Sequence, residues 1–235
     1  MKEESVSVKQ GKKALFYLIV QYQTDKIEAE RTIQMGNGNR GNTMIIKNGL
    51  VFTPEGKFEK KDFYIEGEYV AKETTDNKEV EAEGCYVIPG LVDIHFHGCV
   101  RHDMCDGTEE SIQALADYEA ANGVLAICPA TMTIPEEELF QAMNAAREHK
   151  NGKGADLVGI NMEGPFVNKE KKGAQKEEDI KLADVELFHK LQEAAGGLIK
   201  LVDLAPETEG AMDFINQVKD EVHVSIAHTM ADYDT

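Results

Sequence analysis

Between residues 87 and 228 the sequence alternates short apolar segments with segments of helical periodicity, and this alternation limits the possible folds more than any other feature. The apolar segments cover residues 87–97, 124–133, 156–164, 198–206 and 222–228. Between them, apolar residues recur at helical spacing near residues 108–121, 135–146, 187–195 and 212–219. Apolar strands that alternate with helices are typical of a parallel sheet covered by helices. The sequence therefore predicts an α/β fold. A doubly wound sheet and a (β/α)8 TIM-like barrel, of which about five strands are present, both fit this period.

Short polar motifs predict where some elements begin and turn. Thr133 and Glu136 form a T-x-x-E capping box with Pro135 in the first turn, which predicts the start of a helix. Further upstream, Asn48-Gly49 and Glu66-Gly67 interrupt β-rich segments and predict tight hairpins.

The chain divides into three predicted regions. Residues 1–43 end in the polar, glycine-rich stretch "MGNGNRGNT", and we expect an N-terminal extension that is disordered or is a translated leader before a true start at Met44. A genuine N-terminal arm is the alternative. Residues 44–84 have the pattern of part of a small β-sandwich domain, and residues 85–235 that of the N-terminal part of the (β/α) barrel.

Composition excludes several classes of function. The formal net charge is −18, from 43 acidic and 25 basic residues. Nucleic-acid binding is therefore not expected, because it requires a clustered cationic surface. No apolar run approaches the length of a membrane span, so no membrane association is expected. The four cysteines have neither zinc-finger spacing nor the density of a disulfide scaffold, and we expect reduced thiols in a cytoplasmic protein.

Side chains that can bind a metal ion occur at the predicted strand ends. His95 and His97 share one strand face, because side chains in a strand alternate with period two. Two such imidazoles can converge on one ion, and the alternative is a pair of half-exposed histidines on a polar face. Glu163 and His228 end two further apolar strands. In a barrel all these ends lie on one rim, so the four residues predict a site for a divalent ion, with zinc as a good match.

The other histidines carry weaker signals. His102 lies in the loop "VRHDMC", where surface placement is favoured over a catalytic role. His149 and His189 lie among charged helical residues, so we expect both to be solvated. His223 begins a predicted strand, at the end of a barrel that is remote from chemistry.

Several motifs together resemble the N-acetylglucosamine-6-phosphate deacetylases of the amidohydrolase superfamily. They are "PGLVDIHFHG", "EGPF", "KKGAQ", "LAPE" and "SIAHT", all within residues 44–235. The pair "EGPF" and "KKGAQ" is the specific part, whereas H-x-H after a strand identifies only the superfamily. The resemblance implies metal-dependent hydrolysis of the acetamide of N-acetylglucosamine 6-phosphate to glucosamine 6-phosphate and acetate.

The resemblance also implies roles for particular residues and partners. Glu163 and His228 match metal ligands of the family, and an intact H-x-H can hold a second metal. One or two divalent ions, a phosphosugar substrate and, at full length, a homodimer are implied. The roles carried over are metal ligation by Glu163, His228, His95 and His97, and sugar contact by Ala174 and Gln175.

Other residues that the family uses would lie beyond Thr235. They include a strand-six histidine ligand, several substrate-binding residues and a general-base aspartate at strand eight, so no catalytic residue is assigned within this chain. Catalytic metal sites normally use three protein ligands, and general-base catalysis contributes roughly 10²–10⁴-fold. We therefore expect the chain alone to be inactive. We also expect residues 44–235 to be poorly soluble or to associate through an open sheet edge.

Two alternatives stay open. The first is another amidohydrolase that acts on a C–N bond, such as a dihydroorotase-like or deaminase-like enzyme. Many of these use a modified lysine at strand four, and Lys200 near the start of that strand disfavours them. The second is a truncated, non-catalytic half-barrel that binds a partner or derives from a broken reading frame.

Overall fold

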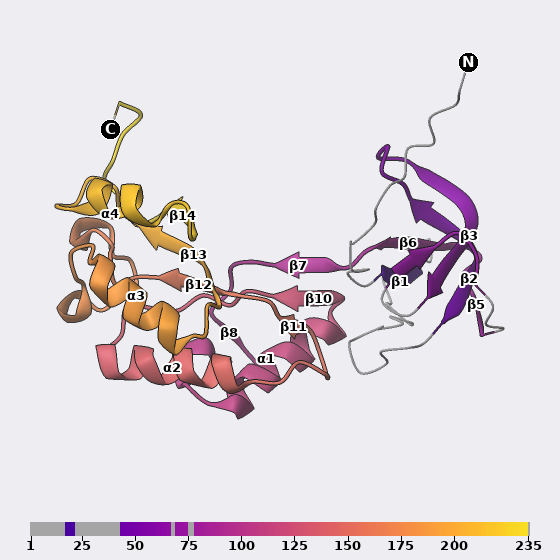
Figure 1. Ribbon diagram of the computed structural model, residues 1–235, viewed down its shortest axis with the longest axis horizontal. Helices are drawn as coiled ribbons and strands as arrows, with labels where there is room; N and C mark the ends of the chain where they lie inside the picture. The colour runs from indigo at the N-terminus through magenta and orange to yellow at the C-terminus, as the bar shows by residue number, and fades with distance from the viewer. Residues whose placement is uncertain (1–16, 22–42, 67–68, 75–77, 235) are drawn as a thin grey trace, which may run out of the picture. The chain divides into compact units, whose positions relative to one another are not determined.

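The structure is a computed structural model that describes residues 17–21, 43–66, 69–74 and 78–234 (Figure 1). The chain divides into two compact units, Met1–Gly90 and Leu91–Thr235. Most of the extension predicted for residues 1–43 lies outside the described residues. Within it, Tyr17–Gln21 forms a strand that pairs with the first unit's sheet, and the assignment of residues 1–43 as a disordered extension or leader stays a prediction.

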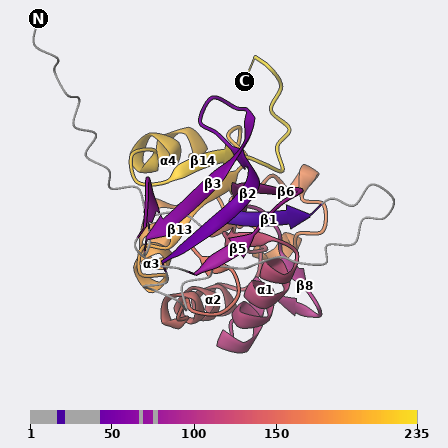
Figure 2. The ribbon, with the colours of Figure 1, turned by 90° about the vertical axis from the view of Figure 1, so that its right-hand side faces the viewer.

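The first unit is a mixed six-stranded sheet. Its strands are β1 (Tyr17–Gln21), β2 (Met44–Phe52), β3 (Phe58–Glu66), β4 (Tyr69–Ala71), β5 (Glu79–Glu81) and β6 (Cys85–Pro89). The strand order is β1-β6-β2-β3-β4, and β5 also pairs with β2. Figure 2 shows the long antiparallel pair β2 and β3 side by side. The antiparallel pairing of β3 with β4 joins Glu66 to Tyr69 and confirms the predicted hairpin at Glu66-Gly67.

Asn48 forms a β-bulge inside β2, so the hairpin predicted at Asn48-Gly49 is wrong. Its φ is 60°, and the β2–β3 register shifts between Ile46 and Gly49. The extra residue restores the alternation, so that Ile46, Gly49 and Val51 are all buried on the core face. A Cβ on Gly49 would lie 2.6 Å from Val87 Cγ2, which explains why this position needs glycine.

The boundary between the units follows Gly90, whereas the sequence placed it before Cys85. Strand β6 pairs antiparallel with β1 and parallel with β2. Val87 is fully buried in the core of the first unit. The apolar run that precedes His95 therefore consists of two strands that belong to different units.

The second unit is built on parallel strands. They are β7 (Leu91–Asp93), β10 (Val124–Ile127), β11 (Asp156–Leu157), β12 (Ile160–Glu163), β13 (Ile199–Leu204) and β14 (His223–Ile226). The parallel pairs are β7 with β10, β10 with β11, β12 with β13 and β13 with β14, and a bridge between Ala130 and Asn161 joins the two groups. The consecutive short strands β11 and β12 both lie beside the β10 segment, and each of the other parallel strands lies beside the preceding one in sequence. This order, without a switch point, is that of a (β/α)8 barrel and not of a doubly wound sheet.

Four α-helices connect these strands in the described part of the chain: α1 (Glu109–Ala121), α2 (Glu136–Glu148), α3 (Val185–Ala194) and α4 (Ala211–Val218). The other short elements are the hairpin β8 (Gly98–Cys99) and β9 (His102–Asp103), and the 3₁₀ helices η2 (Met104–Asp106), η3 (Lys169–Lys171) and η4 (Glu177–Asp179). Helices α1, α2 and α3 lie along one side of the strands in Figure 1. Their predicted apolar stripes are buried, including Ile112, Leu139 and Phe188.

The capping box predicted for α2 is wrong. The N-cap of α2 is Pro135, and no side chain caps the helix. Thr133 is only 2% exposed, and its backbone N–H donates to Gln175 Oε1. Its side chain is therefore in the interior of the unit and cannot serve the helix end. Within the described ranges, each helix is too short or too polar to cross a lipid bilayer.

His149 is buried, although the charged residues around it in sequence predicted a solvated side chain. It follows the last turn of α2 and is 8% exposed, and among the residues that the structure describes neither ring nitrogen has a hydrogen-bond partner. Burial lowers the pKa of its imidazole, and the charges of Glu109 and Asp156 oppose this effect without cancelling it. At a pH between the folded and the unfolded pKa of His149, the folded protein therefore holds a neutral imidazole, whereas the unfolded chain binds a proton.

We expect His149 to make the protein less stable as pH falls. A histidine with a lowered folded-state pKa contributes its full stability above the unfolded pKa of about 6.5 and loses it as pH falls toward the folded pKa. Urea denaturation at about pH 7 and about pH 5 measures the effect. The free energy of unfolding should drop less in His149→Leu than in the wild type. His189→Leu, at an exposed histidine, should follow the wild type. Equal pH dependence in all three proteins would contradict this account.

Candidate metal centre

Neighbouring strands of the second unit place polar side chains in register near their carboxyl ends. Glu163 is the last residue of β12 and pairs with Asp203 of β13, which pairs with Ser225 of β14. Asn161, two residues before Glu163, faces the same side of β12. His228 follows the end of β14. Because the strands are parallel, these residues share one end of the sheet.

The two histidines of the H-x-H motif reach this end from the segment that follows β7. The backbone N–H of Ala130 donates to the carbonyl of Phe96 at 2.7 Å, which holds the segment beside the chain that leaves β10. Phe96 packs against the apolar core. The alternation of an extended segment then places His95 and His97 on the opposite side, as predicted.

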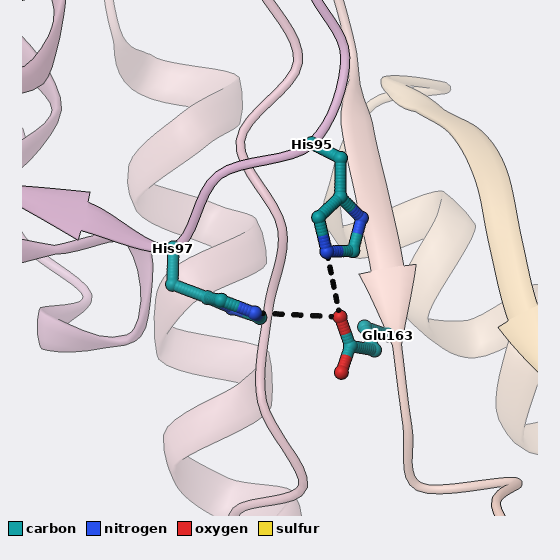
Figure 3. Close-up of side chains that lie close together, drawn as sticks. All are labelled: His95, His97 and Glu163. Atoms are coloured by element: carbon teal, nitrogen blue, oxygen red, sulfur yellow. Dashed lines mark ion pairs between the residues drawn. The ribbon is translucent and has the colours of Figure 1, made fainter. Parts of the chain in front are cut away.

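The carboxylate of Glu163 lies at the centre of the cluster. Its Oε2 is 3.1 Å from His95 Nε2 and 3.4 Å from His97 Nε2 (Figure 3). Its Oε1 is 2.7 Å from His228 Nε2 and accepts a hydrogen bond of 2.6 Å from Gln175 Nε2. Glu163 is only 4% exposed. Each carboxylate oxygen therefore faces its own set of nitrogen atoms.

The charge of Glu163 is maintained by its neighbours. Burial alone would raise the pKa of this carboxyl group, but hydrogen bonds and charge from His97 and His228 outweigh burial and hold the pKa at about 2. The hydrogen bond to Glu163 in turn raises the pKa of His97, against the lowering effect of burial. The neighbouring Asp203 differs, because burial raises its pKa more than Ser225 and His95 lower it. Glu163 is thus ionised at neutral pH and faces three imidazoles.

His228 is held in an unusual backbone conformation. Its φ is 47°, in the left-handed region that non-glycine residues rarely adopt. The backbone N–H of Asn168 donates to the carbonyl of His228 at 3.1 Å. The ring Nδ1 is 2.8 Å from the carbonyl oxygen of Lys171. A carbonyl and a carboxylate only accept hydrogen bonds, so in this arrangement Nδ1 donates to Lys171 and Nε2 donates to Glu163. An ion bound at Nε2 would take the place of the Nε2 proton and leave the Nδ1 bond intact.

Glu207 fixes the loop that carries His228. One oxygen of its carboxylate accepts from Asn168 Nδ2 and from the backbone N–H of Met230, each at 2.7 Å. The other accepts from Thr229 Oγ1 at 2.5 Å. Burial raises the pKa of Glu207, but these hydrogen bonds lower it by more, so the pKa lies below its usual value. Glu207 therefore joins the segments after β12, β13 and β14.

A cavity of about 380 Å³ opens beside the cluster. Its lining consists of His95, His97, Met132, Glu163, Ala174, Gln175, Ala227 and His228. Ala174 is exposed there, whereas Gln175 is 2% exposed and uses its amide to bond Glu163 and Thr133. Both residues predicted to contact substrate thus line the cavity, and their contact with a sugar stays a prediction.

The donor set fits a divalent metal ion. The ligand atoms of His95, His97 and Glu163 all lie within 4.8 Å of one another. Two donors that share a tetrahedral zinc ion with bonds of about 2.0–2.1 Å lie roughly 3.3 Å apart. The observed separations of 3.1 and 3.4 Å match this spacing. A buried carboxylate that faces several imidazole nitrogens also has the chemistry that zinc and similar ions prefer.

The structure gathers all four residues that the sequence assigned to metal binding, and their ligation of a metal stays a prediction. It adds Asn161 and Asp203, which the sequence analysis missed. The available signal was a polar residue inside an otherwise apolar strand, as in "INMEG" and "LVDLAP". Lys200, the second residue of β13, bonds to the carbonyl of Gly197, away from this end.

The chain is similar to N-acetylglucosamine-6-phosphate deacetylases in sequence and in structure. It is 37% identical over 195 residues to the N-acetylglucosamine-6-phosphate deacetylase of Bacillus subtilis, which covers 80% of this chain and 48% of that protein. The solved deacetylase of Pasteurella multocida superposes with a TM-score of 0.72 at 21% identity, over 82% of this chain and 52% of that one. A mutant of the Mycobacterium smegmatis deacetylase, in complex with N-acetyl-D-glucosamine-6-phosphate, gives a TM-score of 0.70 at 23% identity, over 83% and 52% of the two chains. No protein-family model matches the chain.

The sequential parallel strands, with a histidine and glutamate cluster at their ends, are the features that the sequence resemblance to the amidohydrolases implied. The chain is a homologue of the N-acetylglucosamine-6-phosphate deacetylases, which confirms the resemblance found in the motifs. It spans about half the length of the curated relatives it matches, 48% and 52% for two of them.

We expect Glu207→Gln to destabilise the second unit. All three partners of Glu207 are donors, and an amide offers one acceptor oxygen and places an N–H against a donor. Hydrogen bonds to charged groups contribute about 1.5–3 kcal/mol each to stability, so the free energy of unfolding should fall by about 1–3 kcal/mol. Urea denaturation measures this loss. Glu209→Gln, at an exposed residue of the same loop, should change it by less than about 0.5 kcal/mol.

Proposed function

We propose that this protein hydrolyses the acetamide of N-acetylglucosamine 6-phosphate, with a bound divalent metal, to give glucosamine 6-phosphate and acetate. The observation that carries the proposal is the buried Glu163 carboxylate bordered by three histidines at the strand ends. Relatives of the chain are named for this activity. A structural relative is solved with the sugar phosphate bound, which supports a phosphosugar as the substrate class.

Two sets of metal-binding atoms share the carboxylate of Glu163, and this supports the proposal that one or two metal ions bind. The first set is His95 Nε2, His97 Nε2 and Glu163 Oε2. The second is His228 Nε2 and Glu163 Oε1. Nitrogen and carboxylate donors suit zinc, which we propose as the metal.

An acetamide is a poor electrophile, and a bound divalent ion supplies a Lewis acid for its carbonyl oxygen together with a water whose pKa is lowered to about 7. The protein's own residues prepare the site for that ion. Glu163 is ionised at neutral pH because its pKa is held at about 2, so it attracts a cation without first losing a proton. The carbonyl of Lys171 accepts the Nδ1 proton of His228, so Nε2, once its own proton leaves, is the nitrogen that can bind the ion.

The cavity beside the cluster supports the substrate assignment. Met132, Ala174 and Ala227 give part of its lining an apolar character, which suits the methyl group of an acetamide. Gln175 holds Glu163 in place and lines the same cavity. We propose Ala174 as a direct substrate contact, and Gln175 as a residue that links substrate binding to the position of Glu163.

Further parts of the proposal concern partners and location. We propose a homodimer for the full-length protein, a cytoplasmic location, and no nucleic-acid or membrane partner. The net charge of −18 supports the absence of a nucleic-acid partner. The four free cysteines support a reducing compartment.

Removing the charge of Glu163 should remove metal binding. Glu163→Gln replaces a ligand shared by both donor sets with a neutral amide. Substitution of a residue that only supports a ligand lowers metal affinity roughly 10–100-fold, so the loss of zinc affinity in Glu163→Gln should be larger than this. Replacing both His95 and His97 by alanine should abolish only the first donor set. Competition with a chromogenic chelator measures both effects, and Glu170→Gln, at an exposed glutamate, is the control. Wild-type zinc content in Glu163→Gln would show that the ligand assignment is wrong.

The reaction itself is best tested in a chimera. Because the chain spans about half of its relatives, residues 44–235 would replace the matching part of the Bacillus subtilis deacetylase. With zinc, the chimera should release acetate from N-acetylglucosamine 6-phosphate, and release it faster than from unphosphorylated N-acetylglucosamine. The same chimera with Glu163→Gln is the control and should lose nearly all turnover. A folded, zinc-loaded chimera that releases no acetate would overturn the proposed function.

A further inference from the structure

His95 has a second ring nitrogen whose surroundings the metal cluster leaves unexplained. While Nε2 faces Glu163, Nδ1 lies 2.9 Å from Asn161 Nδ2 and 3.5 Å from Asp203 Oδ2. Asn161 Nδ2 also donates to the carbonyl of Ile94 at 3.2 Å. Two polar side chains from adjacent strands therefore meet at one imidazole nitrogen.

Both of these side chains are buried and incompletely bonded. Asn161 and Asp203 are each 2% exposed. In the described part of the chain, Asn161 Oδ1 and Asp203 Oδ1 have no hydrogen-bond partner. Burying an unpaired acceptor costs free energy, and such groups are rare in folded proteins. Their position behind a metal-facing histidine suggests that they accept a proton in another state of the site.

The required state follows from the chemistry of imidazole. In the arrangement seen here, the Asn161 amide donates to Nδ1, so the His95 proton is on Nε2 and points at Glu163. A metal ion binds an imidazole nitrogen through its lone pair. With an ion at Nε2, the proton of His95 must be on Nδ1. Nδ1 then donates a hydrogen bond, so its partner must be an acceptor and can no longer be the N–H of Asn161. The change moves a proton between the ring nitrogens and leaves the charge of His95 unchanged.

We propose that Asp203 is a positioning residue that accepts the Nδ1 proton of His95 and so directs Nε2 to the metal. A carboxylate only accepts hydrogen bonds, so Asp203 favours the tautomer of His95 that carries its proton on Nδ1. An amide can also donate, so it can satisfy the tautomer that carries the proton on Nε2 as well. The register of β12 and β13 sets Asp203 directly beside Glu163, so both groups that act on His95 are fixed by one strand pair. This inference rests on the proposed metal site and adds the group that prepares one of its ligands.

The test uses the whole chain with ¹⁵N-labelled histidines and zinc. In the wild type, the ring-nitrogen spectrum of His95 should show a protonated Nδ1 and a metal-bound Nε2, and the Nδ1 proton should exchange with solvent more slowly than that of exposed His189. In Asp203→Asn this protection should be lost, and zinc affinity, measured by chelator competition, should fall about 10–100-fold. Asp156→Asn removes another buried carboxylate, on β11, and should keep wild-type affinity.

The outcomes separate this inference from the proposed function. A wild-type chain that binds no zinc overturns the metal site itself. Wild-type zinc affinity in Asp203→Asn, with the His95 spectrum unchanged, overturns the role of Asp203 and leaves the metal site intact. If Asp203→Asn does not fold, the wild-type spectrum decides, because zinc on Nδ1 or an unprotected Nδ1 proton would contradict the proposal.

Discussion

The buried carboxylate of Glu163 is the constraint on which the rest of the site depends. A charge that is 4% exposed is costly unless other groups pair with it and hydrogen-bond to it. Its partners come from three separate segments: the stretch after β7, the loop after β12 and the end of β14. These segments meet only if the strands run parallel and in sequential order. The charge therefore ties the chemistry of the site to the topology of the fold.

A second layer of polar contacts keeps those partners in place. Glu207, which follows β13, bonds to the segments after β12 and β14 and fixes the loop of His228, whose left-handed backbone would otherwise be unfavourable. Gln175 bonds to Glu163 with one end of its amide and to Thr133 with the other. The two bonds of Gln175 are buried, and the bonds that Glu207 accepts from Asn168 and Thr229 are partly buried, so these contacts position the imidazoles before any ion arrives. Preorganisation of this kind is what a metal site requires to bind tightly.

The sequence predicted the parts of this arrangement that depend on strand polarity and alternation. Glu163, His228 and the H-x-H pair follow apolar strands, and parallel strands bring such positions to one edge. It did not separate β6 from β7, because the apolar run across Gly90 carries no signal of which sheet each half joins. It also misplaced His149 and Thr133, whose neighbours in sequence are charged or helical. Their burial is set by contacts with distant residues, as the bond between Thr133 and Gln175 shows.

The role of Asp203 also could not be predicted from the sequence. An aspartate in "LVDLAP" breaks an apolar strand, but its significance appears only when the β12–β13 register places it beside Glu163 and 3.5 Å from His95. Likewise, the bulge at Asn48 has the sequence of a hairpin turn, and only the pairing of β2 with β3 shows that the strand continues. Local motifs thus predict elements, whereas register and burial require the tertiary structure.

The central claim is that Glu163 and the H-x-H histidines hold a divalent ion. A crystal of the zinc-treated protein, measured on both sides of the zinc absorption edge, tests it most directly. The account predicts an anomalous peak about 2.0–2.2 Å from Glu163 Oε2 and from the Nε2 atoms of His95 and His97. An anomalous map with no peak at this cluster, or with zinc bound only to other residues, would contradict it.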